Sequence, residues 1–531
     1  MSGRANDQLA ATVVGAIIAY DVELAFVSPG SRSTPLIAAL QAAGLRMHLV
    51  LDERAAAYAA VGAARAGVIA AVVTTSGTAV ANLLPGLAEA ERDELPIVAM
   101  TADRPQQEVD VRANQTVPQP PLLAGAARAS VDLCAKGLPP SWREQLTHAL
   151  GALRGPSPGP VHLNLRFDKP LAPTDACGQA EVISVAERAD APIPAAPWTG
   201  AERGLVVVGA LPHHARSGVA TLIDALPWPS LVDVTSGLDR ARPGRFCPAL
   251  LRAAEARQRL QPDRVLWIGG RLTEPAVGDW LRSADVTQWR TGDAVRASDG
   301  VSPRAYRVDF RGPLPDPASA TASALDFAPF AAAFPDPPAE LNEPAVAQLV
   351  ADALGPDDLL FVGSSMPIRD VDRFARRLAA PVLANRGVSG IDGNVATALG
   401  AHVATGRPVT ALLGDLALLH DASSLGQLAR DGAAVRVVCV NNSGGGIFHF
   451  LPIASHDKLF EPWFTAPHDQ DTVAIGGGFG VAARQVTSFD ELASTLRTPP
   501  NKPELLEVRT DRDANHALHV ELDRRYQDAL R

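Results

Sequence analysis

The chain has 531 residues, of which 47% are hydrophobic, a composition that fills more than one core and excludes a disordered chain. Its 43 glycines and 44 prolines break helices too often for a coiled coil. The formal net charge of −10 is the opposite of the basic surplus that nucleic-acid-binding proteins show. At roughly 100 to 200 residues per domain, the length predicts about three domains.

Arginine supplies almost all of the positive charge. The 48 basic residues include four lysines, which leaves 44 arginines. Codon usage in a GC-rich genome is the simplest explanation for most of them. The planar guanidinium also binds carboxylates through two parallel hydrogen bonds, which lysine cannot do, so some of these arginines are candidates for carboxylate recognition.

The cysteines and the N-terminus indicate a cytoplasmic protein. Cys134, Cys177, Cys247 and Cys439 form no CxxC pair, so we expect reduced, buried thiols rather than a zinc or redox site. The N-terminal residues lead directly into a helical pattern without an apolar signal core. No run of 18 apolar residues occurs, so we expect no transmembrane helix.

Two segments rich in proline and alanine divide the chain, at about 169–200 and 313–344. Such composition is typical of linkers or irregular connections. We therefore expect three domains, with limits near 1–175, 198–330 and 342–531.

Short apolar runs alternate with helical stretches along all three segments. Each run is followed by a polar turn, and the runs lie at 25–27, 70–75, 96–100, 204–209, 264–269, 359–363, 409–414 and 435–440. Strand, turn and helix in alternation predict an α/β protein with doubly wound parallel sheets. Ligands of such sheets lie beyond the carboxyl ends of the strands, so the residues that follow each strand are the candidates for a site.

The strongest of these candidates is a pair of polar residues at two expected strand ends. Asp415 follows the run 409–414 within Gly414-Asp415-Leu416, and Asn442 follows the run 435–440. A carboxylate, an amide oxygen, a backbone carbonyl and diphosphate oxygens would complete an octahedral Mg²⁺ shell. The glycines Gly444, Gly445 and Gly446 would let the backbone approach a diphosphate. An ordinary strand-end turn and an asparagine cap are the structural alternative.

A second candidate is Glu53, which follows the apolar run 48–50 within Asp52-Glu53-Arg54. Taken alone, it is best explained as an acidic residue in the first turn of a helix, where the helix dipole favours negative charge. Beside the Asp415 and Asn442 motif, a catalytic role becomes the better interpretation.

Arginines and small polar residues recur at other expected strand ends. For any single arginine, a solvated or ion-paired side chain is the more common outcome, but their recurrence favours a site that holds several carboxylates. These candidates are Ser31, Arg32, Arg104, Asn114, Gln115, Arg271, Ser365, Arg369 and Arg386.

Together, the motifs resemble one family of thiamine-diphosphate (ThDP) enzymes. The segments are SPGSRSTPL, DER, TSGTAVANLLP, ADRP, ANQ, GPVHLN, SMPIRD, NRGVSGIDG, GDL and NNSGGGIF. They are similar to those of the 2-succinyl-5-enolpyruvyl-6-hydroxy-3-cyclohexene-1-carboxylate synthases of menaquinone biosynthesis. The match runs from about residue 28 to 451 and is weak in the middle segment. It implies three doubly wound parallel-sheet domains of the ThDP-enzyme type: pyrimidine-binding, central and diphosphate-binding.

The resemblance implies both a reaction and cofactors. Enzymes of this family decarboxylate 2-oxoglutarate and add the resulting succinyl carbanion equivalent to isochorismate in a 1,4 fashion. The implied cofactors are ThDP and Mg²⁺, with Mn²⁺ as a possible substitute. The two substrates together carry four carboxylates, which fits an arginine-rich pocket.

The resemblance also assigns roles to residues. Glu53 would hydrogen-bond the cofactor's pyrimidine ring, and Asp415, Asn442 and the Gly444 carbonyl would hold the metal. Ile391 would support the bent cofactor. The other cofactor contacts would be Ser389, Gly390, Gly414, Leu416, Gly445 and Ile447. The catalytic group would also include Ser31, Arg32, Gln115 and Ser365. The substrates would contact Arg104, Asn114, Arg271, Arg369, Arg386, Ile447, Phe448 and Leu451.

Members of the family share their active sites between subunits, so the resemblance implies a homodimer or a dimer of dimers. Two rival interpretations remain. One is another ThDP enzyme that acts on 2-oxoacids, of the acetohydroxyacid synthase or decarboxylase type. The other is a non-catalytic regulatory protein with the same fold. We expect no nucleic acid and no membrane as partners.

Overall fold

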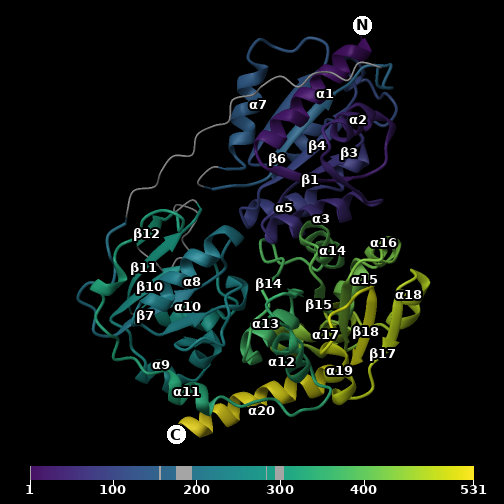
Figure 1. The fold of residues 1–531 in the computed structure, drawn as a ribbon. Helices are drawn as coiled ribbons and strands as arrows, with labels where there is room; N and C mark the ends of the chain where they lie inside the picture. The colour runs from purple at the N-terminus through teal and green to yellow at the C-terminus, as the bar shows by residue number, and fades with distance from the viewer. Residues whose placement is uncertain (1, 155–156, 175–193, 283, 293–303) are drawn as a thin grey trace. The chain divides into compact units, whose positions relative to one another are not determined.

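The computed structural model describes residues 2–154, 157–174, 194–282, 284–292 and 304–531. Within them the chain forms three six-stranded sheets (Figure 1). By their internal contacts the residues fall into two compact units. The first is Met1–Ala189 with Asn385–Gly406, and the second is Asp190–Ala384 with Arg407–Arg531.

The first unit contains a parallel sheet with the strand order β2-β1-β3-β4-β6-β5. Its strands are β1 (Val22–Val27), β2 (Arg46–Leu49), β3 (Ile69–Thr74), β4 (Ile97–Asp103), β5 (Ala129–Cys134) and β6 (Val161–Arg166). Its helices are α1 (Ser2–Ala19), η1 (Ser31–Ser33), α2 (Thr34–Ala42), α3 (Glu53–Arg65), α4 (Thr78–Ala81), α5 (Leu84–Arg92), η2 (Gln106–Glu108), α6 (Gln119–Leu123) and α7 (Trp142–Gly151).

Helices cover both faces of this sheet. Successive side chains of a strand point to opposite faces, and along β1 they enter two separate hydrophobic clusters. Ala25 and Val27 pack with residues of α1, α2 and α7, whereas Leu24 and Phe26 pack with residues of α3 and α5. The sheet is therefore doubly wound, as the alternating pattern of the sequence predicts.

The second unit contains two more parallel sheets. The central sheet has the order β12-β11-β10-β7-β8-β9. Its strands are β7 (Gly204–Val208), β8 (Ser230–Val232), β9 (Arg245–Phe246), β10 (Arg264–Ile268), β11 (Asp285–Arg290) and β12 (Arg304–Arg307). Its helices are η3 (His213–Ala215), α8 (Arg216–Ala225), η4 (Val234–Ser236), η5 (Pro248–Arg252), α9 (Ala254–Arg259) and α10 (Pro275–Leu281).

The third sheet has the order β14-β13-β15-β16-β18-β17. Its strands are β13 (Leu359–Val362), β14 (Val382–Leu383), β15 (Val409–Gly414), β16 (Val435–Asn441), β17 (Ala482–Gln485) and β18 (Glu504–Arg509). The helices along this part of the chain are α12 (Glu343–Ala353), α13 (Met366–Phe374), α14 (Asn394–Thr405), α15 (Asp415–His420), α16 (Ser423–Asp431), η8 (Gly446–Phe450), η9 (Pro452–Ser455), α17 (Asp457–Trp463), α18 (Thr472–Gly478), α19 (Phe489–Leu496) and α20 (Arg512–Leu530).

The order of the strands places the ligand-binding edge of each sheet. Counted along the chain, the first and third sheets share the order 2-1-3-4-6-5, while the central sheet has 3-2-1-4-5-6, the order of the classic dinucleotide-binding fold. In the two outer sheets the direction of winding reverses between the first and third strands, which are β1 and β3 in one sheet and β13 and β15 in the other. Open sheets bind ligands at this reversal, beyond the carboxyl ends of the strands.

Helix α14 packs in the first unit although it follows β14 of the third sheet along the chain. It meets α3 at two glycines. A Cβ on Gly62 would lie 2.0 Å from the carbonyl oxygen of Thr397, and one on Gly400 would lie 1.9 Å from that of Ala59. The two helix backbones can approach this closely only because both positions lack a side chain.

The expected connection at 313–344 is more ordered than its composition predicts. It forms η7 (Pro317–Ser319) and α11 (Ala328–Ala333). Phe327, Phe330 and Phe334 are buried in one hydrophobic cluster with Leu522 and Tyr526 of α20. The aromatic side chains fix this segment to the core despite its prolines. Most of the other expected connection, 169–200, lies outside the described residues.

The cysteines differ in part from expectation. Cys439 is buried, but Cys134 and Cys247 are only partly buried, and all three are free thiols. Cys177 lies outside the described residues. Among the described helices, none combines the length and apolar character that crossing a membrane requires.

Candidate active site

The Asp415 and Asn442 motif lies at the carboxyl edge of the third sheet. Strands β15 and β16 are hydrogen-bonded neighbours, with Gly414 opposite Val440. Asp415 is the first residue of α15, directly after β15, and Asn442 directly follows β16. The parallel register therefore brings the two side chains to the same edge of the sheet, as the sequence predicts.

The Asp415 carboxylate is buried and held by backbone donors. Asp415 is only 2% exposed. The backbone N–H of Leu416 donates to Oδ1 at 2.6 Å, and that of Gly444 donates to Oδ2 at 2.9 Å. The Nε2 atom of His468 lies 3.2 Å from the same Oδ2. Burial raises the pKa of Asp415, while the two backbone donors and His468 oppose that rise.

Asn441 and Asn442 are neighbours with different surroundings. The amide of Asn441 is satisfied at both ends, since Oδ1 accepts from Ser443 N–H at 3.0 Å and Nδ2 donates to Glu507 at 2.7 Å. The amide of Asn442 is satisfied at one end, where Nδ2 donates to Glu343 Oε1 at 2.7 Å. Its Oδ1 is buried and has no hydrogen-bond partner among the described residues.

A buried amide oxygen without a partner and a buried carboxylate at the same edge of the sheet are donors that suit an oxygen-bound cation. Gly444 adds a backbone that can approach a ligand closely. Its φ is 149°, and a Cβ there would lie 2.4 Å from the carbonyl oxygen of Thr465. Among the described residues, no three His, Cys, Asp or Glu side chains gather as a metal cluster. The Asp415 carboxylate, the Asn442 amide oxygen and the Gly444 carbonyl are all oxygen donors, the kind of set that Mg²⁺ prefers.

Glu343 is the buried acid behind this motif, and sequence reasoning missed it. It is the first residue of α12 and is 4% exposed. Burial, Asp370 and Asp415 raise the pKa of Glu343 to about 8, against the opposing hydrogen bonds from Asn442 and Thr510. An acid in the first turn of a helix is too ordinary a pattern to single it out.

His468 was also missed. Its Nδ1 accepts a hydrogen bond from the backbone N–H of Gln470 at 3.2 Å, which assigns the ring proton of the neutral imidazole to Nε2. That nitrogen faces Asp415. No spacing in the sequence links His468 to a motif 53 residues earlier.

The glycine-rich segment continues into an apolar stretch. Gly445 donates its backbone N–H to the Thr465 carbonyl at 2.6 Å. Ile447 and Phe448 lie in η8 and are partly buried, and Phe448 meets Phe464 edge-on with ring centroids 5.7 Å apart. Leu451 is 45% exposed. This stretch offers apolar surface immediately after the metal motif.

Ser365 and Arg369 lie at the start of α13, directly after β13. Ser365 occupies the N-cap position with φ at +75° but makes no side-chain capping hydrogen bond, and the Arg369 guanidinium donates to its carbonyl. The two residues are thus brought together, at the strand next to β15. Arg271 instead follows β10 of the central sheet and is exposed.

Glu53 is the first residue of α3, in the first unit. Asp52 caps this helix, and its side chain accepts the backbone N–H of Arg54 at 2.8 Å and of Ala55 at 3.4 Å. Glu53 itself is partly exposed. The cap fixes the start of the helix and therefore the position of Glu53.

Arg32 is the most unusual of the expected substrate-site residues. It follows β1 in η1 and is 2% exposed. One guanidinium nitrogen donates to the Phe167 carbonyl at 2.8 Å, but Nε is buried without a partner among the described residues. Burial and the neighbouring Arg104 lower its pKa. Glu108, Asp103 and Asp168 act against that lowering, and the buried Nε–H is left as a donor that an anion can accept. Ser31, the residue before it, is exposed.

The loop that contains Asn114 and Gln115 is tied to two strand ends of the first sheet. The Arg104 guanidinium, directly after β4, donates to the Asn114 carbonyl at 2.9 Å. Gln115 has φ at +60°, and its side chain donates to the Ser76 carbonyl, after β3, at 3.0 Å. Arg104, Asn114 and Gln115 are therefore brought together.

The segment with Arg386, Ser389, Gly390 and Ile391 is fixed to helices of the first unit. Glu89 of α5 accepts the backbone N–H groups of Gly387 and Val388, both at 2.8 Å. Tyr58 of α3 donates to Asp392 at 2.6 Å. The loop is thus held to the helix that begins at Glu53.

Two backbone features shape this loop further. Ser389 has φ at +58°. A Cβ on Gly390 would lie 2.2 Å from an Asp392 carboxylate oxygen, and Asn394 donates its amide to the Ile391 carbonyl at 2.6 Å. Ile391 is therefore presented from a tight, defined turn.

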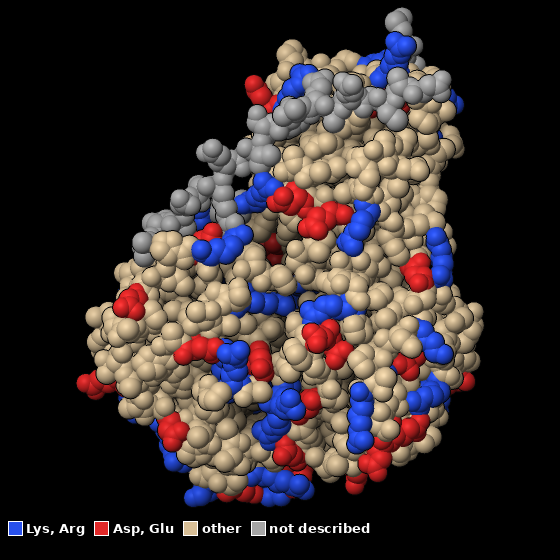
Figure 2. Space-filling view, in the orientation of Figure 1, with Lys and Arg blue, Asp and Glu red and all other residues tan. Residues whose placement is uncertain are grey.

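Most other arginines have structural partners. Acidic and basic side chains are interspersed over the face shown in Figure 2. Arg240 and Asp372, for example, form an ion pair in which both are 2% exposed. Such pairs give many of the described arginines a structural role that needs no ligand.

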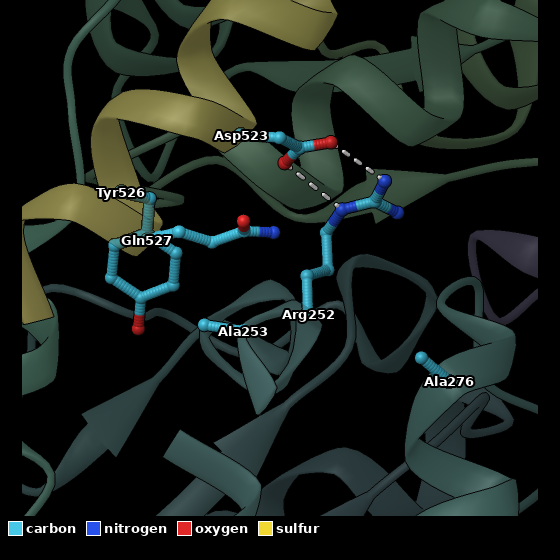
Figure 3. A pocket seen from close by; sticks show the side chains of 6 residues that line it. All are labelled: Arg252, Ala253, Ala276, Asp523, Tyr526 and Gln527. Atoms are coloured by element: carbon cyan, nitrogen blue, oxygen red, sulfur yellow. Dashed lines mark hydrogen bonds and ion pairs between the residues drawn. The ribbon is translucent and has the colours of Figure 1, made fainter. Parts of the chain in front are cut away.

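One pocket of about 220 Å³ lies beside α20 in the second unit (Figure 3). Its lining comprises Arg252, Ala253, Ala276, Asp523, Tyr526 and Gln527. The guanidinium of Arg252 pairs with Asp523 at 3.0 Å and Glu274 at 2.9 Å. The pocket contains none of the residues that the sequence singled out, and its one cation is already neutralised.

Three family models match the chain, one for each sheet. They are the N-terminal TPP binding domain of thiamine pyrophosphate enzymes at 7–124, the middle domain of thiamine pyrophosphate enzymes at 188–301 and the C-terminal TPP binding domain at 371–508. With the fold and the Asp415 motif, these matches define a thiamine-diphosphate enzyme.

The similar curated proteins narrow this class. One from Rubrobacter xylanophilus is 39% identical, over 98% of both chains. Others from Salinibacter ruber (35%, over 98% of this chain and 96% of its own) and Myxococcus xanthus (37%, over 96% and 95%) are similar over almost their whole lengths. All three are named 2-succinyl-5-enolpyruvyl-6-hydroxy-3-cyclohexene-1-carboxylate synthase. The chain belongs to this family of ThDP-dependent transferases.

Proposed function

We propose that this protein decarboxylates 2-oxoglutarate and adds the resulting succinyl unit to isochorismate in a 1,4 fashion. The product would be 2-succinyl-5-enolpyruvyl-6-hydroxy-3-cyclohexene-1-carboxylate, in menaquinone biosynthesis. The observation that carries the proposal is the near-complete match to relatives named for that product. The buried, unpartnered Oδ1 of Asn442 and the buried Asp415 carboxylate support the cofactor part of the proposal.

Thiamine diphosphate, when bound, would supply the electron sink for the decarboxylation. Asp415, Asn442 and the Gly444 carbonyl would hold Mg²⁺, or Mn²⁺ in its place, and the metal would bind the diphosphate. Glu53 would hold a proton at the pyrimidine nitrogen. Gly414, Leu416, Gly445, Ser389, Gly390 and Ile391 would shape the cofactor site.

The substrate carboxylates require cationic partners. Arg32 is buried with an unpartnered Nε, and Arg104 lies close enough to lower its pKa. We assign these two, with Arg369, Arg386 and Arg271, to carboxylate binding. Ser31, Asn114, Gln115 and Ser365 would contribute polar contacts, and Ile447, Phe448 and Leu451 an apolar wall.

The test of the substrate pair is direct. Protein with ThDP, Mg²⁺, 2-oxoglutarate and isochorismate should deplete the isochorismate absorbance, and omission of either substrate should stop the reaction. Turnover of pyruvate alone, with none of this pair, would instead support a decarboxylase or an acetohydroxyacid synthase.

The metal assignment has a separate test. Asp415→Ala should abolish Mg²⁺-dependent binding of ThDP in calorimetry, because the variant loses the only charged ligand of the proposed set. Normal binding by this variant would overturn the metal site.

The proposal includes a homodimer or a dimer of dimers in the cytoplasm. Light scattering on the purified protein measures the mass directly. A monomeric mass at the concentrations that support full activity would refute a shared active site.

A further inference from the structure

The Asn442 amide has two alternative orientations, related by a flip that exchanges Oδ1 and Nδ2. The oxygen and nitrogen ends are hard to tell apart by shape, so packing alone does not decide which end makes which contact. In the structure Nδ2 donates to Glu343 Oε1 at 2.7 Å. Oδ1 is left buried and open.

The Oε1 atom of Glu343 is a hydrogen-bond acceptor in this arrangement. Oε1 also accepts the Thr510 hydroxyl at 3.1 Å, so two donors converge on it. Gly446 leaves room for the amide, because a Cβ there would lie 2.8 Å from Nδ2. The Asn442 amide is thereby held between Glu343 Oε1 on one side and Gly446, which has no side chain, on the other.

We propose that Glu343 is a positioning residue that orients the Asn442 amide, so that its oxygen and not its nitrogen faces the bound divalent cation. The inference rests on the proposed metal site and goes beyond it, because Glu343 would act through Asn442 and not as a ligand. An amide turned the other way would present N–H donors to a cation, which cannot ligate it.

Metal ligands lose affinity when the groups behind them are removed, typically by about 10- to 100-fold. Glu343→Ala deletes the acceptor and frees the amide to turn. Glu343→Gln keeps a carbonyl oxygen where Oε1 lies, and that oxygen can still accept from both Asn442 and Thr510. Glu343→Ala should therefore weaken cation binding by at least about tenfold, and Glu343→Gln should restore most of it.

The measurement is Mn²⁺ binding to the full-length protein in the presence of ThDP, followed by electron paramagnetic resonance. It reads the metal directly and does not depend on turnover. Asn342→Ala is the matched control, because Asn342 caps the same helix through the Ala345 N–H at 2.9 Å. That variant should lower the Tm and leave the Kd for Mn²⁺ unchanged.

Each outcome decides something different. Wild-type affinity in Glu343→Ala, with binding abolished in Asp415→Ala, would overturn the positioning role and leave the metal site standing. Equal weakening in Glu343→Gln and Glu343→Ala would show that charge and not orientation matters, and would overturn it too. Weakening by Asn342→Ala to the same degree would trace the effect to the helix. Normal affinity in Asp415→Ala would remove the metal site itself.

Discussion

Arg32 offers the sharpest test of the substrate site. Its removal should lower kcat/KM, because a carboxylate contact is lost, and should hold or raise the Tm, because a buried charge is removed. The guanidinium is 2% exposed and makes one hydrogen bond, to the Phe167 carbonyl. Burial lowers its pKa, so the folded protein tolerates this charge at a cost. Arg32→Met keeps the length of the apolar stem and removes the charge.

A charge-assisted hydrogen bond to a substrate carboxylate contributes about 1.5 to 3 kcal/mol. At about 1.36 kcal/mol per factor of ten, its loss should lower kcat/KM by roughly 10- to 150-fold for at least one of the two substrates. The Tm should hold or rise, because the variant loses one carbonyl contact but no longer buries an incompletely satisfied cation.

Initial rates over a range of each substrate concentration give kcat/KM, and thermal unfolding gives the Tm. Arg154→Ala is the control, since Arg154 also donates to a backbone carbonyl, that of Ala19, at 3.1 Å. Its kcat/KM should match wild type. Values for Arg32→Met within twofold of wild type for both substrates, or a fall in activity that merely follows a fall in Tm, would refute the carboxylate-binding role.

Three further predictions concern other parts of the chain. Glu53→Gln should cut kcat strongly and leave ThDP affinity in calorimetry nearly unchanged; equal losses in both would indicate a role in binding only. Gly400→Ala should lower the free energy of unfolding by about 1 to 3 kcal/mol, because its Cβ would lie 1.9 Å from the Ala59 carbonyl oxygen. Gly477→Ala, also in a helix but with nothing within 4 Å, should be neutral or stabilising by up to about 1 kcal/mol, and equal effects in urea titrations would contradict the close packing. Burial lowers the pKa of His162 to about 4 in the folded protein. In the unfolded chain the same side chain binds a proton near pH 6.5. The free energy of unfolding therefore falls as the pH drops from about 6.5 toward 4, by roughly 2 kcal/mol between pH 7 and 5. His162→Gln should remove this pH dependence in urea unfolding. An unchanged pH slope in that variant would refute the prediction.

The local part of the site could be predicted from the sequence. Asp415 and Asn442 each follow a short apolar run, and parallel pairing of β15 and β16 then places them at one edge without further information. The same logic located Ser365 after β13 and Arg32 after β1. These predictions succeed because a strand end depends on the residues immediately around it.

The partners of those residues could not be predicted. Glu343 reaches Asn442 across 99 positions, and only the packing of α12 against the sheet brings them together. The position of α14 is a similar case. The Gly400 contact that places it against α3 depends on the shape of both surfaces. The buried phenylalanines at 327–334 show that a proline-rich composition does not exclude attachment to a core.

The assignment of Asn385–Gly406 to the first unit has a consequence for how the protein is made. All strands of the first sheet have been synthesised once translation has passed residue 166. The helix that packs against α3 is complete only when residue 406 has been added. At about 5 to 20 residues per second, that interval lasts roughly ten seconds or more. Throughout it, the alanine-rich surface of α3 is uncovered on the nascent chain. The first unit to emerge from the ribosome is therefore not the first to be finished, and its aggregation during synthesis depends on how fast the rest of the chain follows.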